Sequence, residues 1–168
     1  MRRACPRPLI AVSIAAIAAA LSACTTTPGG PPPPTEPAVA PAEPTLPPRF
    51  QPQELIGRWG YAAYHRPDDR GRTEAAARGQ CKVPYVIGAG PTGGLMMYLA
   101  DQKEKAELTV KGSRSGKDYV GPKEDPPGGA QDREVVSFDG RVLILRWIDP
   151  EVAGRYGTAI YVRCGPRA

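Results

Sequence analysis

The stretch "EVVSFDGRVLILRW", from Glu134 to Trp147, indicates the fold most directly. Two strand-like runs, residues 134–138 and 141–147, flank the pair Asp139-Gly140. An Asp-Gly pair between such runs is the strongest short-range signal for a β-hairpin. The second run is largely apolar on both of its alternating faces, so we expect both faces of that strand to be covered. The stretch predicts antiparallel pairing.

Runs of the same kind recur through residues 51–168, which we expect to fold as one domain. A helix is predicted to follow Pro67 and to end at Gly79, and a further helical turn within residues 149–157. The fold class expected is therefore mainly all-β: a small antiparallel up-and-down β-barrel or sandwich of about seven or eight strands with one short helix. The other strands are expected at residues 57–64, 95–99, 107–112 and 159–164.

The segment "YVIGAGPTGG", Tyr85 to Gly94, has the Gly-x-Gly-x-x-Gly spacing of a dinucleotide-binding loop. Such a loop needs a helix after it and then a second parallel strand that ends in an acid. Lys111 stands where that acid is required, and the rest of the domain reads as hairpins. We interpret the glycines as a turn between two strands and expect no cofactor.

The beginning of the chain has the pattern of an export signal. Arginines in the first seven residues precede an apolar run from Leu9 to Ala20, which is too short to span a bilayer but has the length of a secretory signal core. The alternatives are an ordinary cleaved signal peptide and an N-terminal anchor helix. The residues that follow resemble the lipobox of bacterial lipoproteins: Leu21, Ser22, Ala23 and Cys24.

The lipobox resemblance implies cleavage of a signal peptide, residues 1–23, and attachment of lipid to the sulfur of Cys24. Several acyl chains together hold a protein permanently at a membrane. Thr25 stands where inner-membrane lipoproteins of this class have Asp, and the resemblance therefore implies the outer membrane, where we expect the periplasmic face. We therefore expect a lipid-anchored protein of the cell envelope.

Residues 24–50 join the lipidated cysteine to the domain and are rich in proline. Such a segment has few backbone donors and little apolar surface, so we expect a disordered, extended tether. A ligand for a proline-reading domain is the alternative interpretation of this segment.

The charge of the chain excludes one class of partner. The full sequence has 22 basic and 17 acidic residues, a net charge of +5. Removal of Arg2, Arg3 and Arg7 with the signal leaves 19 − 17 = +2. No basic run of the kind found in nucleic-acid readers remains, so we expect no nucleic-acid partner.

The cysteines point to one disulfide and to no metal. Cys5 leaves with the signal and Cys24 is lipidated, so Cys81 and Cys164 remain as a pair in an oxidising compartment. The single histidine and two cysteines do not supply a usual zinc ligand set.

Two further resemblances concern the domain itself. Gly57-Arg58-Trp59 resembles the Gly-x-Trp opening of lipocalin-like barrels, which implies that Arg163 of the last strand packs over Trp59. A lipobox, a linker, this opening and one disulfide together are also similar to bacterial protease-inhibitor lipoproteins. In those inhibitors both cysteines lie in the first half of the domain, whereas Cys164 is close to the end of this chain.

The remaining chemistry is sparse and favours binding over catalysis. His65 is the only histidine, and no serine lies in a nucleophile-elbow context. We expect no enzyme activity, a filled barrel interior without a ligand cavity, and recognition at exposed loops. The candidate binding surface comprises His65 and the loop 121–129, with Lys123, Glu124 and Asp125.

The sequence thus predicts a non-catalytic interaction module of the cell envelope, whose partner is another envelope protein or a protease. One alternative is a periplasmic protease inhibitor. The other is a carrier of a small apolar ligand, of the lipocalin type.

Overall fold

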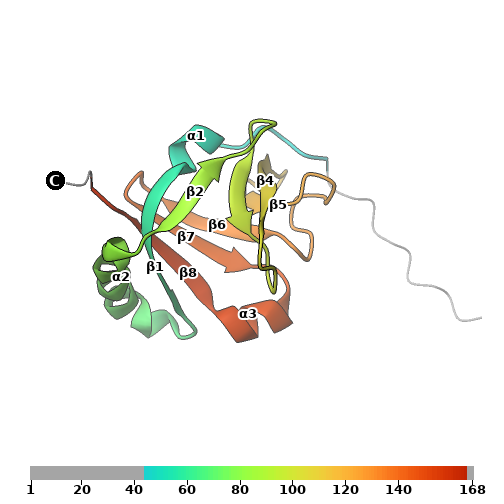
Figure 1. Ribbon diagram of the computed structural model, residues 1–168. Coiled ribbons are helices and arrows are strands. Elements are labelled where there is room, and N and C mark those ends of the chain that lie inside the picture. Colours follow the sequence, from blue (N-terminus) through green and yellow to red (C-terminus); the bar gives the residue numbers. More distant parts are fainter. Residues whose placement is uncertain (1–43, 166–168) are drawn as a thin grey trace, which may run out of the picture. The chain divides into compact units, whose positions relative to one another are not determined.

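The computed structural model describes residues 44–165, and eight strands in it form a closed antiparallel barrel (Figure 1). Each strand pairs with the next, and the last pairs with the first. The mainly β fold predicted from the sequence is confirmed as the barrel alternative. The strands are β1 (Gly57–Tyr64), β2 (Tyr85–Ala89), β3 (Leu95–Tyr98), β4 (Lys105–Gly112), β5 (Asp118–Gly121), β6 (Arg133–Phe138), β7 (Val142–Trp147) and β8 (Thr158–Arg163).

The predicted lipobox Leu21, Ser22 and Ala23, together with Cys24 and most of the tether, lies outside the described residues. No helix in residues 44–165 is long and apolar enough to cross a membrane.

A hairpin joins β6 to β7 at Asp139-Gly140 as predicted, but its connection is longer than the two residues expected. β7 begins at Val142, and the register pairs Phe138 with Leu143. Oδ1 of Asp139 accepts hydrogen bonds from the backbone N–H groups of Arg141 and Val142, at 2.8 and 2.6 Å. Gly140 has a φ of 84°, a conformation that favours glycine. A bulge between Val135 and Ser137 shifts the register within this hairpin.

The glycine-rich segment is a turn, as predicted. β2 and β3 on either side of it are antiparallel. The N–H of Gly90 donates to the carbonyl of Gly94 at 2.8 Å, and Oε1 of Glu107 accepts from the N–H groups of Thr92 and Gly94. A Cβ on Gly94 would lie 2.5 Å from the carbonyl oxygen of Leu108, so close packing requires glycine there.

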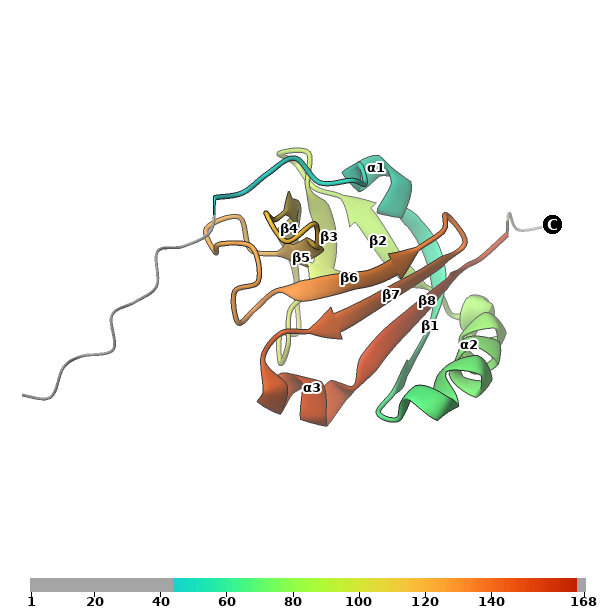
Figure 2. The ribbon, with the colours of Figure 1, turned by 180° about the vertical axis from the view of Figure 1, so that it is seen from behind.

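Helix α2 (Arg70–Gly79) covers the outer face of the barrel at β1 and β8 (Figure 2). It follows a 3₁₀ turn at Pro67–Asp69 and ends at the predicted Gly79. A Cβ on Gly60 would lie 1.9 Å from the Ala77 carbonyl oxygen, so the helix approaches β1 at a residue without a side chain. Ala77 of the helix forms a buried cluster with Ile144, Ile160 and Val162 on the outer face of the barrel, so both faces of β7 are covered as expected.

A disulfide joins Cys81 to Cys164. Cys81 lies in the 3₁₀ turn Gln80–Lys82 after α2, and Cys164 directly follows β8. The bond therefore attaches the end of α2 to the strand that closes the barrel.

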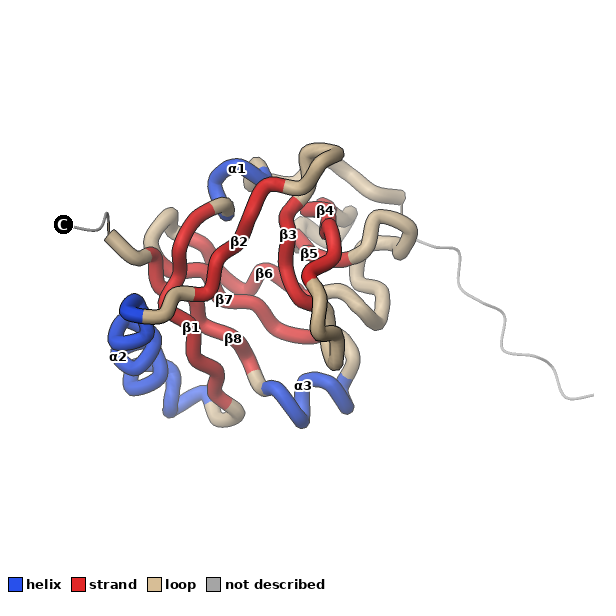
Figure 3. The backbone as a smooth tube through the Cα atoms, viewed as in Figure 1, coloured by secondary structure: helices blue, strands red, loops and turns tan. Residues whose placement is uncertain are grey.

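Helix α1 (Pro52–Leu55) covers one end of the barrel, and α3 (Pro150–Tyr156) lies at the other (Figure 3). At the α1 end, Trp59 is fully buried and its Nε1 donates to the carbonyl of Leu55 at 3.0 Å. The Cζ atom of Arg163 lies 4.2 Å from the centre of the Trp59 ring. The two residues named from the lipocalin resemblance are thus in contact, in the part of the interior that is filled.

The folded unit begins before the expected boundary at Gln51. The backbone of Leu46 exchanges two hydrogen bonds with that of Gly112, at 2.8 and 3.0 Å, and Nε of Arg49 lies 2.7 Å from Oδ2 of Asp118. The Phe50 ring meets Phe138 edge-on at 5.3 Å between centres. Prolines cannot donate to a sheet, but Leu46 retains its N–H and supplies the bridge.

Candidate functional site

A pocket of about 270 Å³ opens at the α3 end of the barrel. The interior is therefore not filled along its whole length, and the expectation of a core without a cavity is wrong at this end. Ala159 contributes only a methyl group here, so the large rings around it leave a space. The aromatic walls are Tyr61, Tyr85, Tyr98, Tyr156, Tyr161 and Trp147.

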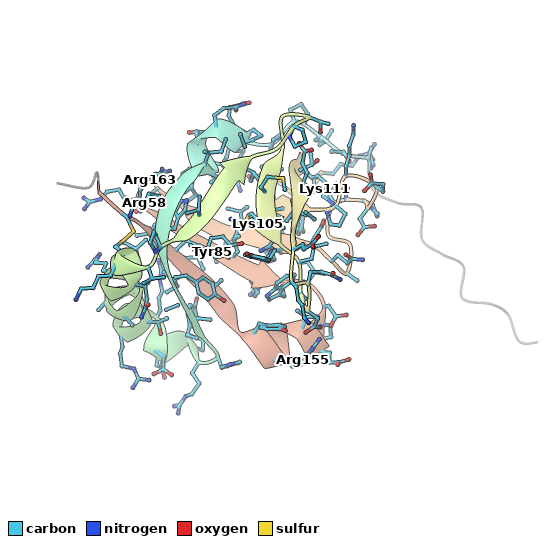
Figure 4. The ribbon with its side chains drawn as sticks, in the orientation of Figure 1. Arg58, Tyr85, Lys105, Lys111, Arg155 and Arg163 are labelled. Atoms are coloured by element: carbon cyan, nitrogen blue, oxygen red, sulfur yellow. A yellow bond between two sulfur atoms is a disulfide. The ribbon has the colours of Figure 1, made fainter. Side chains whose placement is uncertain are left out.

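Strand alternation places the tyrosines in this wall. Tyr61 follows Trp59 on the inward face of β1, and the β1–β8 register sets it opposite Tyr161. Their ring centres are 5.2 Å apart. Tyr85, at the start of β2, lies 5.3 Å from Tyr161 and 5.9 Å from Tyr61 between ring centres (Figure 4). The three rings form one continuous aromatic surface.

Arg133 is the charged residue within this aromatic surface. It begins β6, shares the inward face with Val135, and is only 2% exposed. The β6–β7 register sets it opposite Trp147, and its Cζ lies 4.7 Å from the centre of that ring. Its Nε and Nη2 atoms are buried and have no hydrogen-bond partner among residues 44–165. Buried charges are normally paired, so these two donors are a distinctive feature of the pocket.

The phenols near Arg133 are neutral donors. Burial raises the pKa of Tyr61, Tyr85 and Tyr161 above the ordinary value of a phenol, and the charge of Arg133 opposes that rise. The guanidinium also lies close to the hydroxyls of Tyr85 and Tyr161, and the backbone N–H of Tyr98 opposes the rise at Tyr85. All three hydroxyls therefore carry their protons near neutral pH. They can donate hydrogen bonds to an anion, and their rings can enclose an apolar body.

One side of the pocket is bounded by an ion pair between the β3–β4 loop and α3. Asp101 accepts a hydrogen bond from the Tyr156 hydroxyl at 2.5 Å, and its Oδ2 lies 2.9 Å from a guanidinium nitrogen of Arg155. These two bonds hold the pKa of Asp101 below its ordinary value. Both Asp101 and Tyr156 line the pocket, so the pair joins two segments that surround it.

A second hollow adjoins the first and shares Tyr61, Tyr85 and Tyr98 with it. The Nζ atom of Lys105 lies 5.6 and 5.5 Å from the ring centres of Tyr85 and Tyr98, and it donates to the Val86 carbonyl at 2.5 Å (Figure 4). This lysine is thus engaged outside the pocket that contains Arg133.

The structure does not bring the predicted surface residues together. His65 follows β1 and lies beside Gly157, where a Cβ would be 3.3 Å from His65 Cε1. Lys123, Glu124 and Asp125 lie in the loop after β5, which is opposite β1 in the closed order of strands. None of these four residues lines a described pocket at the α3 end.

A buried ion pair fixes the loop after β5. Nζ of Lys111 lies 2.6 Å from Oδ1 of Asp132, and the two side chains are 1% and 0% exposed. Nζ also donates to the carbonyls of Pro122 and Asp125, both at 3.0 Å. Burial raises the pKa of Asp132, while the bond to Lys111 opposes that rise. The loop is therefore held in one conformation by buried donors and acceptors.

Sequence reasoning missed Arg133 and the tyrosines around it. Counting outward from a two-residue turn at Asp139-Gly140 would set Arg133 opposite Arg146. The longer connection and the bulge set it opposite Trp147 instead, so the hairpin signal alone could not have found this arginine. The described residues contain no group of three or more His, Cys, Asp or Glu side chains able to hold a metal.

Among known proteins, no family model, no curated protein and no solved structure matches the chain. The pocket is thus the main basis for a functional proposal.

Proposed function

We propose that this protein is a non-catalytic binding protein of the cell envelope, and that it holds one small organic anion at the α3 end of its barrel. The observation that carries the proposal is the buried guanidinium of Arg133, whose Nε and Nη2 atoms are unpaired. The proposal favours a ligand carrier over an interaction module or a protease inhibitor. It changes the expected ligand from purely apolar to anionic.

The anionic group of the proposed ligand is inferred from the free-energy cost of burying the Arg133 guanidinium without a partner. A guanidinium stays charged at any pH a protein meets, and burial without a partner costs several kcal/mol in general. An anion that reaches Nε and Nη2 would replace the lost hydration with two charge-assisted hydrogen bonds. The ligand-free protein is therefore destabilised by the unpaired guanidinium, and binding of an anion would remove that destabilisation.

The apolar part of the proposed ligand is inferred from the side chains that line the pocket. Six aromatic side chains and Leu99 line the pocket. Burial of apolar surface contributes about 25 cal/mol per Å², so such walls favour a ligand with an apolar part. A small inorganic anion would leave these rings uncovered.

The location in the envelope rests on separate observations. The lipobox-like residues from Leu21 to Cys24 support a lipid anchor at the outer membrane, and the Cys81–Cys164 disulfide suits an oxidising compartment. Conversion of Cys24 to Ser is expected to abolish lipid labelling and to release the protein into a soluble fraction.

Native mass spectrometry of the protein purified from its own envelope tests the binding function. We expect one small anionic molecule per chain in the unaltered protein and none in Arg133→Met. The matched control is Arg146→Met, which removes an arginine of β7 that pairs with Glu134 at the surface. Identical spectra for the unaltered protein and Arg133→Met would count against the proposal.

A further inference from the structure

We propose that the ligand of this pocket is an aromatic monocarboxylate of about one ring, whose carboxylate is held by the Nε–Nη2 edge of Arg133. This inference rests on the proposed binding function and names the chemical class of the ligand. It follows from the shape of the unpaired edge, from the charges around the pocket, and from its walls and size.

The two unpaired nitrogens of Arg133 lie on one edge of the guanidinium. Nε–H and the neighbouring Nη2–H point in the same direction, and this fork matches the two oxygens of a carboxylate in one plane. Trp147 packs against the guanidinium, with its ring centre 4.7 Å from Cζ, and fixes the direction of the edge. A planar, two-oxygen acceptor is the complementary group.

The charges around the pocket favour a single negative charge on the ligand. Within the described part of the chain, Arg133 is the only cation that lines the pocket, and Asp101 adds a carboxylate at its boundary. Arg155 is already paired with Asp101, and Lys105 donates to the Val86 carbonyl. A dianion such as a phosphate monoester would bring a second charge without a second cation.

Tyr85 offers a further donor for the carboxylate. Its hydroxyl oxygen accepts the backbone N–H of Tyr98 at 3.1 Å, which leaves its own hydrogen to be donated. Because burial keeps the pKa of Tyr85 above the ordinary phenol value, that hydrogen is present near neutral pH. The phenol can therefore add a neutral donor to the charged fork.

The walls and the volume indicate an aromatic body of modest size. Tyr61, Tyr85 and Tyr161 present tilted and edge-on rings, an arrangement into which another ring inserts with favourable edge and face contacts. The pocket of about 270 Å³ lies just below the usual range for drug-sized ligands, which begins at about 300 Å³. It suits one ring with a short acid group.

Isothermal titration of the full chain near neutral pH with five named compounds tests this inference. Benzoate is the expected ligand. Cyclohexanecarboxylate lacks the aromatic ring, benzyl alcohol lacks the charge, and benzenesulfonate and phenyl phosphate replace the carboxylate. We expect benzoate to bind at least about tenfold more tightly than each of the others. Cyclohexanecarboxylate loses the ring contacts, benzyl alcohol loses the charged hydrogen bonds, benzenesulfonate lacks the planar two-oxygen acceptor, and phenyl phosphate brings a second charge.

Variants then locate the binding. Arg133→Met is expected to weaken benzoate roughly 10- to 100-fold, and Tyr85→Phe roughly 2- to 10-fold. Arg133→Lys keeps the charge but lacks the fork, so we expect it to fall between the unaltered protein and Arg133→Met. Arg146→Met is expected to bind benzoate as the unaltered protein does.

The outcomes separate the two proposals. Equal or tighter binding of benzenesulfonate or phenyl phosphate overturns the carboxylate assignment, and equal binding of cyclohexanecarboxylate overturns the aromatic one, while either leaves the binding function standing. If no anion binds, or if Arg133→Met binds every anion as before, both proposals fail. We also expect empty Arg133→Met to unfold at no lower urea concentration than the unaltered protein, because a buried unpaired charge is gone. A clear loss of stability would assign Arg133 a structural role instead.

Discussion

The guanidinium carbon of Arg163 lies 4.2 Å from the centre of the Trp59 ring, and this contact joins the last strand of the barrel to the first. Arg163 also donates hydrogen bonds to the carbonyls of Gly140 and Ile56, at 2.7 and 3.2 Å, and to that of Glu54. The arginine thus links β8 to the β6–β7 hairpin and to helix α1. It closes the end of the barrel opposite the pocket that contains Arg133.

Replacement of Arg163 by Ala is therefore expected to lower the free energy of unfolding by about 2–3 kcal/mol. The loss combines the cation–π contact with several hydrogen bonds to backbone carbonyls. Urea unfolding followed by tryptophan fluorescence measures it. Arg78→Ala, which removes an exposed pair with Glu74 within α2, is the control and should cost roughly 0.5 kcal/mol. Equal effects of the two substitutions would contradict this role.

The disulfide should be the largest single covalent contribution to stability. Cys81 and Cys164 are 83 residues apart in the sequence. Closing a loop of that length stabilises a protein by roughly 4–5 kcal/mol in the chain-entropy model. We expect the double substitution Cys81→Ala, Cys164→Ala to lower the unfolding free energy by about that amount. A reductant should lower the unfolding free energy of the unaltered protein and leave that of the double variant unchanged. Two free thiols on alkylation of the native protein would refute the bond.

The ion pair of Lys111 and Asp132 predicts a specific pattern of mutant stabilities. Asp132→Ala leaves a buried ammonium without its anion and should cost roughly 3–5 kcal/mol. The double variant Lys111→Met, Asp132→Leu removes both charges and should cost less than the single change. Urea unfolding compares the variants. The control is Lys117→Met, which removes an exposed lysine that pairs with Glu134 and should lower the unfolding free energy by roughly 0–1 kcal/mol. A double variant that is no more stable than Asp132→Ala would show that the charges are not the cause.

Asp101 predicts a pH dependence at the boundary of the pocket. Its pKa is lowered by the Tyr156 hydroxyl and by Arg155, so the bonded carboxylate is fully present above the ordinary value of 3.8 and is lost as the pH falls through the lowered pKa. Carboxyl-carbon NMR should show Asp101 titrating below 3.8. Tyr156→Phe should move the pKa of Asp101 upward, whereas Tyr98→Phe, which removes a hydroxyl that Asp101 does not bond, should leave it in place.

The local fold could be predicted because its signals are local. Asp139-Gly140 and the glycines from Gly88 to Gly94 each mark a turn within a few consecutive residues. The strands beside them alternate with a period that shows which side chains share a face. The sequence does not predict where the tether ends, because its proline-rich composition gives no sign that Leu46 and Phe50 pack against the barrel.

The candidate site could not be predicted in the same way, because it depends on which strands become neighbours. In sequence, Arg133 lies between Asp132 and Glu134 and has the pattern of a solvated charge. Only the β6–β7 register places it against Trp147, and only closure of the barrel brings Tyr161 beside Tyr61 and Tyr85. The expected binding residues lie in exposed segments, whereas the candidate pocket is built around the buried Arg133 and Tyr161.

The pairing of β1 with β8 also sets the timing of folding. β1 cannot complete its hydrogen bonds until β8 has been synthesised, close to the end of the domain. The disulfide of Cys81 likewise cannot form before Cys164 has been added. Contacts between such distant segments slow folding, since the loop between them must close first. A chain interrupted before β8 would have an open sheet edge on β1, an unpaired thiol at Cys81 and no Tyr161 in its pocket. The ligand binding that we propose would therefore require the finished chain.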